Sequence, residues 1–199
     1  YLRKGQISQA DAFITELLQQ YPQSHQLQLT HALIKIEQKK YDDADQILHS
    51  INDSALSVDV AAAKVRILLE TGQSQKALAL ADETVKESAG AKPLVLRARA
   101  HIFLDQTEKA LEDIAAALNA DPQYIDAYIM ASDIHTGRGQ IDLAIANIEK
   151  ALAVSPQPQV IKRAVILYLN SGDRRRVEQA RALADNALAA EPQNLELRL

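Results

Sequence analysis

The sequence has no cysteine and no tryptophan, and it is poor in glycine, proline and aromatic residues. Without cysteine in its 199 residues, the chain cannot form disulfide bridges or thiolate metal sites. Six glycines and six prolines provide too few turns for an all-β fold, which favours helices. No apolar run approaches the roughly 18 residues of a membrane-spanning helix. The net charge of −4 excludes bulk binding of polyanions.

Alanine takes the place of the missing bulky residues. Hydrophobic residues make up 47% of the chain, which is enough for a sizeable core. Alanine runs occur at Ala61–Ala63 and at Ala115–Ala117. Because alanine has the highest helix propensity and a very small side chain, these runs predict helices that approach one another closely.

One alanine slot recurs along the whole chain at a nearly constant spacing. The steps between successive members are 34, 33, 33, 34 and 36 residues. The members are Ala10, Ala44, Ala77, Ala110, Ala144 and Ala180. Pro122 and Pro156, which follow apolar helical stretches, are also 34 residues apart. A period near 34 predicts a stack of similar helical units.

The side chains within one period support two helices. In the unit from Ile125 to Pro156, the expected first helix carries Tyr128, Ala131, Ser132 and His135, and the second carries Ala144, Ile148 and Ala151. A turn at Gly137–Gln140 separates the two helices. The preceding unit repeats the pattern with Leu94, Ala98, His101, Ala110, Ile114, Ala117 and Pro122.

This pattern resembles the tetratricopeptide repeat family over essentially the whole chain. The resemblance implies an all-α fold, a right-handed α-solenoid of antiparallel helix pairs. The chain departs from the family pattern in several respects. The leading tryptophan is absent from every unit, with Gln28 in that slot of the unit at about 25–54, and Lys39 and Asp105 stand where glycine would end the first helix. Two extra residues around Asp173–Arg176 predict a longer turn.

The expected organisation is a single array that fills residues 1–199. It consists of a half repeat at 1–22, repeats at about 25–54, 58–89, 91–122, 125–156 and 158–192, and the start of a further helix at 193–199. Gly5 is interpreted as the stop signal of a helix that ends there. Because the chain starts at Tyr1 and ends in a helical pattern, we expect a segment of a longer protein. The cytoplasm and the bacterial periplasm remain equally compatible with the sequence.

The resemblance also implies which first-helix residues face a concave groove. The candidate groove residues are Leu29, Leu33, Arg66, Leu69, Val95, Arg99, Phe103, Ile129, Asp133 and Ile166. A contiguous apolar strip of this kind predicts an interaction site for an amphipathic helix or an extended apolar segment. Arg66 and Arg99 would offer bidentate partners to a carboxylate. The alternative is that several of the aliphatic residues pack against neighbouring first helices.

No catalytic, metal or cofactor site is predicted. His101 and His135 share one slot without a third ligand, so packing is the favoured interpretation. Gly137–Gly139 lacks the preceding strand and the Gly-Lys-Ser/Thr ending of a phosphate loop. Asp42 and Asp43 are interpreted as carboxylates at a helix start, where the dipole favours them. Low aromatic content and negative charge disfavour nucleic-acid binding.

The sequence therefore predicts a non-catalytic scaffold with a protein or peptide partner and no membrane insertion in this segment. Bacterial envelope, secretion or exopolysaccharide assemblies are the settings that the resemblance suggests. The pattern of relatives that clamp chaperone tails is not reproduced, because Val95 with Arg99 and Ile129 with Asp133 occupy the relevant slots. Two alternatives remain open: a structural module that forms homo-oligomers, and a regulatory arm of an enzyme whose catalytic domain lies elsewhere.

Overall fold

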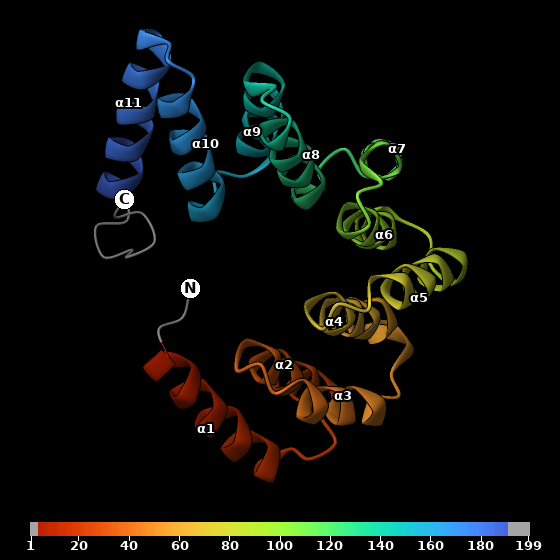
Figure 1. Ribbon diagram of the computed structural model, residues 1–199. Coiled ribbons are helices and arrows are strands. Elements are labelled where there is room, and N and C mark those ends of the chain that lie inside the picture. The colour runs from red at the N-terminus through yellow and green to blue at the C-terminus, as the bar shows by residue number, and fades with distance from the viewer. Residues whose placement is uncertain (1–3, 191–199) are drawn as a thin grey trace. The chain divides into compact units, whose positions relative to one another are not determined.

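All regular structure in the computed structural model, which describes residues 4–190, is helical (Figure 1). The chain forms two compact units, unit 1 (Tyr1–Gln106) and unit 2 (Thr107–Leu199). Unit 1 contains α1 (Lys4–Gln20), α2 (His25–Glu37), α3 (Tyr41–Ser50), the 3-10 helix η1 (Ser54–Leu56), α4 (Ser57–Glu70), α5 (Ser74–Glu87) and α6 (Ala91–Phe103). Unit 2 contains α7 (Thr107–Ala120), α8 (Ile125–Gly137), α9 (Ile141–Val154), α10 (Pro158–Asn170) and α11 (Arg174–Ala190).

Within each unit, a helix packs on the helix that follows it. The pairs α2–α3, α4–α5, α8–α9 and α10–α11 are hairpins joined by short turns (Figure 1). The first helices of successive pairs in unit 1 also touch, α2 with α4 and α4 with α6. The predicted all-α fold of adjacent helix pairs is confirmed.

Small residues allow the helices of a pair to approach closely. Ala44 and Ala77 in unit 1 and Ala144 in unit 2 are completely buried. Larger residues fill the space around them, such as Leu48 in unit 1 and Ile148 in unit 2. The alanine slot found in the sequence is thus a close contact between helices, which a larger side chain would disrupt.

Each described turn between a first and a second helix contains one residue with left-handed backbone. These residues recur every 33 or 34 positions and are Lys39, Gly72, Asp105, Gly139 and Gly172. Lys39 and Asp105 adopt φ of 60° and 56°, although side chains disfavour this region. Lys39 and Asp105, which stand where glycine was expected, therefore adopt the left-handed backbone conformation that glycine favours.

At the position where the family pattern has tryptophan, the side chain links the first helix to the turn before it. Gln28 Nε2 donates to the carbonyl of Pro22 at 3.0 Å. The Tyr128 hydroxyl donates to the carbonyl of Pro122 at 3.1 Å. An amide and a phenol thus make the same hydrogen bond, across six residues, in two repeats.

Two local predictions are wrong. Gly5 does not end a helix, because α1 begins at Lys4 and continues through it. The turn between α10 and α11 is as short as the others, so the extra residues do not lengthen it. They lengthen α11 instead, because arginine is a good helix former and about one added turn keeps Ala180 buried. The predicted further helix at 193–199 lies outside the described residues.

Candidate functional site

Three of the predicted groove residues lie in the core of unit 1 instead of on its surface. Leu29, Leu69 and Val95 have exposed fractions of 4%, 5% and 3%. Leu29 packs in a cluster with Ile36 and Leu48, and Leu69 packs in a cluster with residues of α5 and α6. Because neighbouring first helices touch, Leu29 packs with residues of α4 and Leu69 with residues of α6, and none of the three buried side chains offers a free surface.

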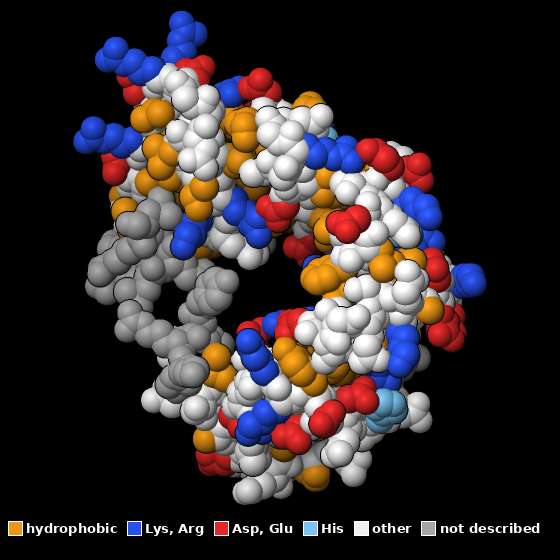
Figure 2. All heavy atoms as spheres, viewed as in Figure 1, with side chains coloured by type: hydrophobic (Ala, Val, Ile, Leu, Met, Phe, Trp, Pro, Cys, Tyr) orange, Lys and Arg blue, Asp and Glu red, His pale blue; other side chains and the backbone are white. Residues whose placement is uncertain are grey.

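Other predicted residues do reach the surface. Leu33, Phe103 and Ile166 are exposed at 40%, 54% and 44%, which is high for large apolar side chains. Ile129 is partly buried against the core of unit 2. Figure 2 shows hydrophobic side chains along α10 and α11, where Leu169 and Val177 are also exposed.

In unit 1, the exposed residues share one side of the first helices. Lys92 on α6 pairs with Asp59 on α4, so these two residues face each other. Arg66 and Arg99 follow them by seven residues, and seven residues are nearly two helical turns. We call the surface formed by Leu33, Glu37, Arg66, Glu70, Arg99 and Phe103 the unit 1 face.

Arg66 is the centre of a charged cluster on the unit 1 face. Its Nη1 donates to Glu37 Oε1 of α2 at 2.7 Å, and its Nε donates to Glu70 Oε1 of α4 at 2.6 Å. The Tyr41 hydroxyl donates to the second oxygen of Glu70 at 2.7 Å. The predicted carboxylate-binding arginine thus already binds two carboxylates of its own chain.

Electrostatics reinforce this cluster. Burial alone would raise the pKa of Glu70, but hydrogen bonds from Arg66 and Tyr41 outweigh it and lower that pKa. Burial alone would lower the pKa of Arg66, but hydrogen bonds to Glu37 and Glu70 raise it. Both groups are therefore held in their charged forms.

Arg99 has a different environment. It makes no ion pair or hydrogen bond with any residue in the described part of the chain. Arg99 is a partly exposed residue on α6, one helical turn before Phe103. Arg99 is therefore a cation available to a partner beside an exposed aromatic ring.

In unit 2, the predicted Asp133 is already paired. Asp133 on α8 accepts a hydrogen bond from Arg163 on α10. Burial raises the pKa of Asp133, and the opposing effect of Arg163 does not fully offset this. We call the surface of Ile129, Asp133, Lys162, Ile166 and Leu169 the unit 2 face.

Glu37 and Tyr41 were not predicted as members of the site. Glu37 precedes Glu70 by one repeat, and this spacing could have revealed it. Tyr41 lies at the start of a second helix, and no pattern in the sequence links it to the first-helix positions.

A polar cluster joins α1 to α2. Lys35 Nζ donates to both carboxylate oxygens of Asp11 at 2.9 Å, and His31 Nε2 lies 3.2 Å from the same carboxylate. Burial is the largest effect on His31 and lowers its pKa, and the charge of Lys35 adds to this. Beside the cluster is a cavity of about 610 Å³ lined by Ile7, Ser8, Asp11, Glu37, Gln38, Lys39 and Lys40.

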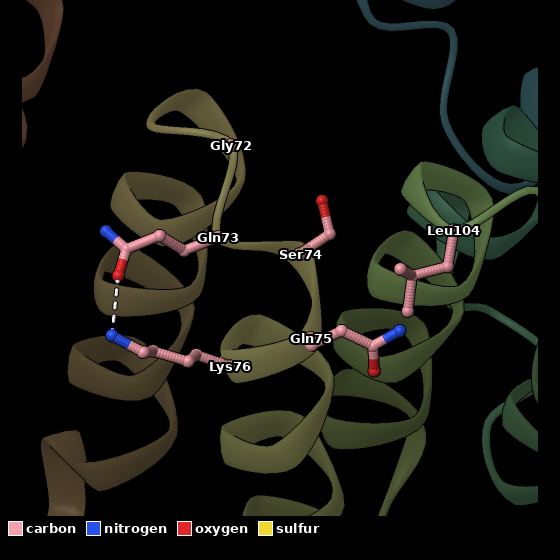
Figure 3. A pocket seen from close by; sticks show the side chains of 6 residues that line it. All are labelled: Gly72, Gln73, Ser74, Gln75, Lys76 and Leu104. Atoms are coloured by element: carbon pink, nitrogen blue, oxygen red, sulfur yellow. Dashed lines mark hydrogen bonds between the residues drawn. The ribbon is translucent and has the colours of Figure 1, made fainter.

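A second cavity, of about 450 Å³, lies at the turn between α4 and α5. Gly72, Gln73, Ser74, Gln75, Lys76 and Leu104 line it (Figure 3). Lys76 Nζ donates to Gln73 Oε1 at 2.9 Å, so the cation is partly satisfied (Figure 3). This shallow site has no grouping of nucleophile, base and orienting residue.

The two histidines of the shared slot make equivalent hydrogen bonds. His101 Nδ1 lies 2.9 Å from Gln106 Oε1, and His135 Nδ1 lies 2.8 Å from Gln140 Oε1. Each histidine thus connects the end of a first helix to the turn after it. Within residues 4–190 there is no group of three potential metal-ligating side chains. None of the helices described there has the length and hydropathy to cross a membrane.

Comparison with known proteins gives a family match and several similar folds. The family model described as tetratricopeptide repeat matches residues 91–124 and 125–158. A thermophilic TPR protein of Thermus thermophilus, TTC0263, is 21% identical with a TM-score of 0.69, covering 88% of this chain and 95% of its own. PilW, a type IV pilus biogenesis factor, is 18% identical with a TM-score of 0.65, covering 100% of this chain and 92% of its own.

A third similar structure is YrrB, described as a TPR protein with an unusual peptide-binding site. It is 11% identical with a TM-score of 0.52, covering 92% of this chain and 95% of its own. At these identities the likeness concerns the fold alone. A search of curated proteins found no match.

Proposed function

Because residues 91–158 match the tetratricopeptide repeat model and the fold resembles that of TPR proteins, we propose that the chain is a member of this family and a non-catalytic scaffold whose first-helix faces bind protein partners. Repeats of this kind generally act as non-catalytic scaffolds and bind through the surface of their stacked helices. The observation that carries the proposal is the exposure of large apolar residues beside charged ones on these faces. Phe103 is 54% exposed in unit 1 and Leu169 is 52% exposed in unit 2.

The burial of Leu29, Leu69 and Val95 narrows the proposed contact surface. The residues that remain available are Leu33, Arg99 and Phe103 in unit 1 and Ile129 and Ile166 in unit 2. Each large apolar side chain that a partner covers would contribute roughly 1.5–3 kcal/mol. A few such contacts on each face would suffice for a stable complex, because a few residues dominate most interfaces.

The experiment is affinity capture from the source cells with quantification by mass spectrometry. Phe103→Asp in unit 1 and Ile166→Asp in unit 2 should each reduce the recovered partner, because a charge in the interface is costly to desolvate. Leu143→Asp is the matched control, because Leu143 is 49% exposed on the second helix α9. Loss of the partner from the control, with full recovery by both face variants, would exclude the proposed faces.

We further propose a bacterial multiprotein assembly as the setting of this scaffold. The support is the likeness of fold to PilW, whose name describes a role in type IV pilus biogenesis. Co-fractionation of the protein with a large envelope complex is the expected result. A freely diffusing protein in gentle extracts of the source cells would contradict this setting.

A further inference from the structure

The unit 1 face contains the same arginine position twice, once satisfied and once not. Arg66 and Arg99 are one repeat apart on the adjacent first helices α4 and α6. Arg66 takes one carboxylate from Glu37, 29 residues earlier, and another from Glu70, four residues later. At Arg66, the positions 29 residues earlier and four residues later therefore each provide a carboxylate for the guanidinium.

At Arg99 both of these positions fail to provide a carboxylate. The residue 29 positions earlier is Glu70, whose two oxygens are already bonded to Arg66 and to the Tyr41 hydroxyl. The residue four positions later is Phe103, in place of the expected acid. Arg99 therefore lacks the carboxylate that its counterpart has, and an exposed ring occupies the place of that carboxylate.

The surroundings offer one unpaired cation, which suits a single carboxylate. Lys92, the other cation of α6 on this face, is paired with Asp59, so no second free cation is available there. Glu37 and Glu70 together exceed the charge of Arg66 by one negative unit. The face is thus cationic and aromatic at α6, and its excess negative charge is shared by Glu37 of α2 and Glu70 of α4, on either side of Arg66.

Resting on the proposed function, we infer that Arg99 and Phe103 accept an acidic side chain next to a bulky apolar residue in an extended partner segment. A guanidinium binds a carboxylate bidentately, and the Phe103 ring covers the neighbouring apolar group. The excess negative charge at Glu37 and Glu70 places a basic residue of the partner over α4. Adjacent packed helices are about 8–10 Å apart, which is about three residues of extended chain.

Blocked synthetic peptides test this assignment on the full chain. The probe is an extended peptide of about 10 residues, or roughly 33 Å, acetylated and amidated at its ends. It carries a lysine, two small residues, a glutamate and two leucines, and its reversed sequence tests the other direction. Calorimetric titration should detect binding of one direction, and replacement of glutamate by glutamine should weaken it about tenfold.

Protein variants assign the effect to Arg99. Arg99→Gln should weaken the glutamate peptide about tenfold and leave the glutamine peptide unchanged, because the two changes remove one interaction. Arg99→Glu should reverse the preference toward a peptide with lysine in place of glutamate. Lys86→Glu on α5 is the matched control, because it makes the same charge change at an exposed second-helix site. Circular dichroism confirms that each variant is folded.

Three results would overturn the inference. These are equal binding of the glutamate and glutamine peptides, unchanged binding by Arg99→Gln, and binding only when the peptide has a free terminal carboxylate. Absence of binding by either blocked peptide would also overturn it. If Phe103→Asp loses the cellular partner while Arg99→Gln retains it, the proposed function stands and this inference fails.

Discussion

At the scale of single residues, the turns between paired helices show how backbone geometry constrains the sequence. Five turns place one residue in left-handed backbone, and glycine occupies three of them. Lys39 and Asp105 occupy the other two at a conformational disadvantage, which is larger for lysine because aspartate tolerates this region better. In the Gly137–Gly139 segment, Gly137 ends α8 and Arg138 and Gly139 form the turn that the sequence indicated.

Replacing Lys39 by glycine should stabilise the protein. We expect Lys39→Gly to raise the free energy of unfolding by about 1 kcal/mol, because it removes the strain of a positive φ at a residue with a Cβ. Asp105→Gly should give a smaller gain. Urea denaturation monitored by circular dichroism measures both, and destabilisation by Lys39→Gly would contradict the assigned backbone.

The polar cluster at His31 should make stability depend on pH. The pKa of His31 is lowered in the folded protein, mainly by burial, so the folded state binds fewer protons than the unfolded state below the ordinary histidine pKa. The stability associated with neutral His31 is therefore present above pH 6.5 and decreases as pH falls through the lowered pKa. His31→Gln removes this dependence.

We therefore expect the wild type to lose stability relative to His31→Gln as the pH falls from about 7 to about 5. Thermal unfolding in a series of buffers measures the difference between the two proteins. Parallel curves over this range would show that His31 protonation is not coupled to folding.

At the scale of secondary-structure elements, close approach within a helix pair depends on small residues. Ala144 on α9 is completely buried, and its carbonyl accepts a hydrogen bond of 2.9 Å from the buried Ser132 hydroxyl on α8. A larger side chain would separate the two helices and strain this bond. The alanine period in the sequence predicted the location of this contact, whereas the hydrogen bond across it was not predicted.

Ala144→Leu should destabilise the protein by about 1–3 kcal/mol, because the packed contact has no room for the added atoms. Ala146→Leu, on the exposed side of the same helix, should change stability by less than about 0.5 kcal/mol. Denaturant midpoints compare the two variants. Equal effects would show that burial at Ala144 does not control the packing of α8 and α9.

The last helix shows how an element can absorb an insertion. The extra residues near Asp173–Arg176 appear as additional length of α11, and Asp173 accepts from the backbone of Arg175 at 2.7 Å. Arg176 extends the contact by donating to Asp142 of α9 at 2.7 Å. Charged residues indicated a turn here, but capping and helix propensity favoured a longer helix.

At the scale of the whole molecule, we expect the helices within each unit to open locally at different free energies. In the described part of the chain, α1 and α11 each contain one buried apolar residue, Ile14 and Ala180, whereas α6 and α10 each contain at least six buried residues. In a repeat array, stability depends on contacts with neighbouring elements, so poorly buried helices open at lower free energy.

Hydrogen exchange followed by mass spectrometry should therefore give lower opening free energies for α1 and α11 than for α6 and α10. Peptides from α4 and α9 serve as internal references, because each of these helices contacts both the preceding and the following helix of its unit. Uniform protection along the chain would contradict the unequal burial.

The sequence by itself determined the class of fold and the repeating helix pair, because an alanine slot with a period near 34 specifies close helix contacts without regard to distant partners. It also placed Leu33, Phe103 and Ile166 at positions that are exposed in the structure. The tertiary structure alone decided which first-helix residues remain available. Val95 is buried, and Leu29 and Leu69 are buried because adjacent first helices pack against them. Arg66 differs from Arg99 because its carboxylates come partly from a neighbouring helix. Burial and charge pairing depend on contacts between helices, whereas the spacing of residues within a helix shows only which of them share a face of that helix.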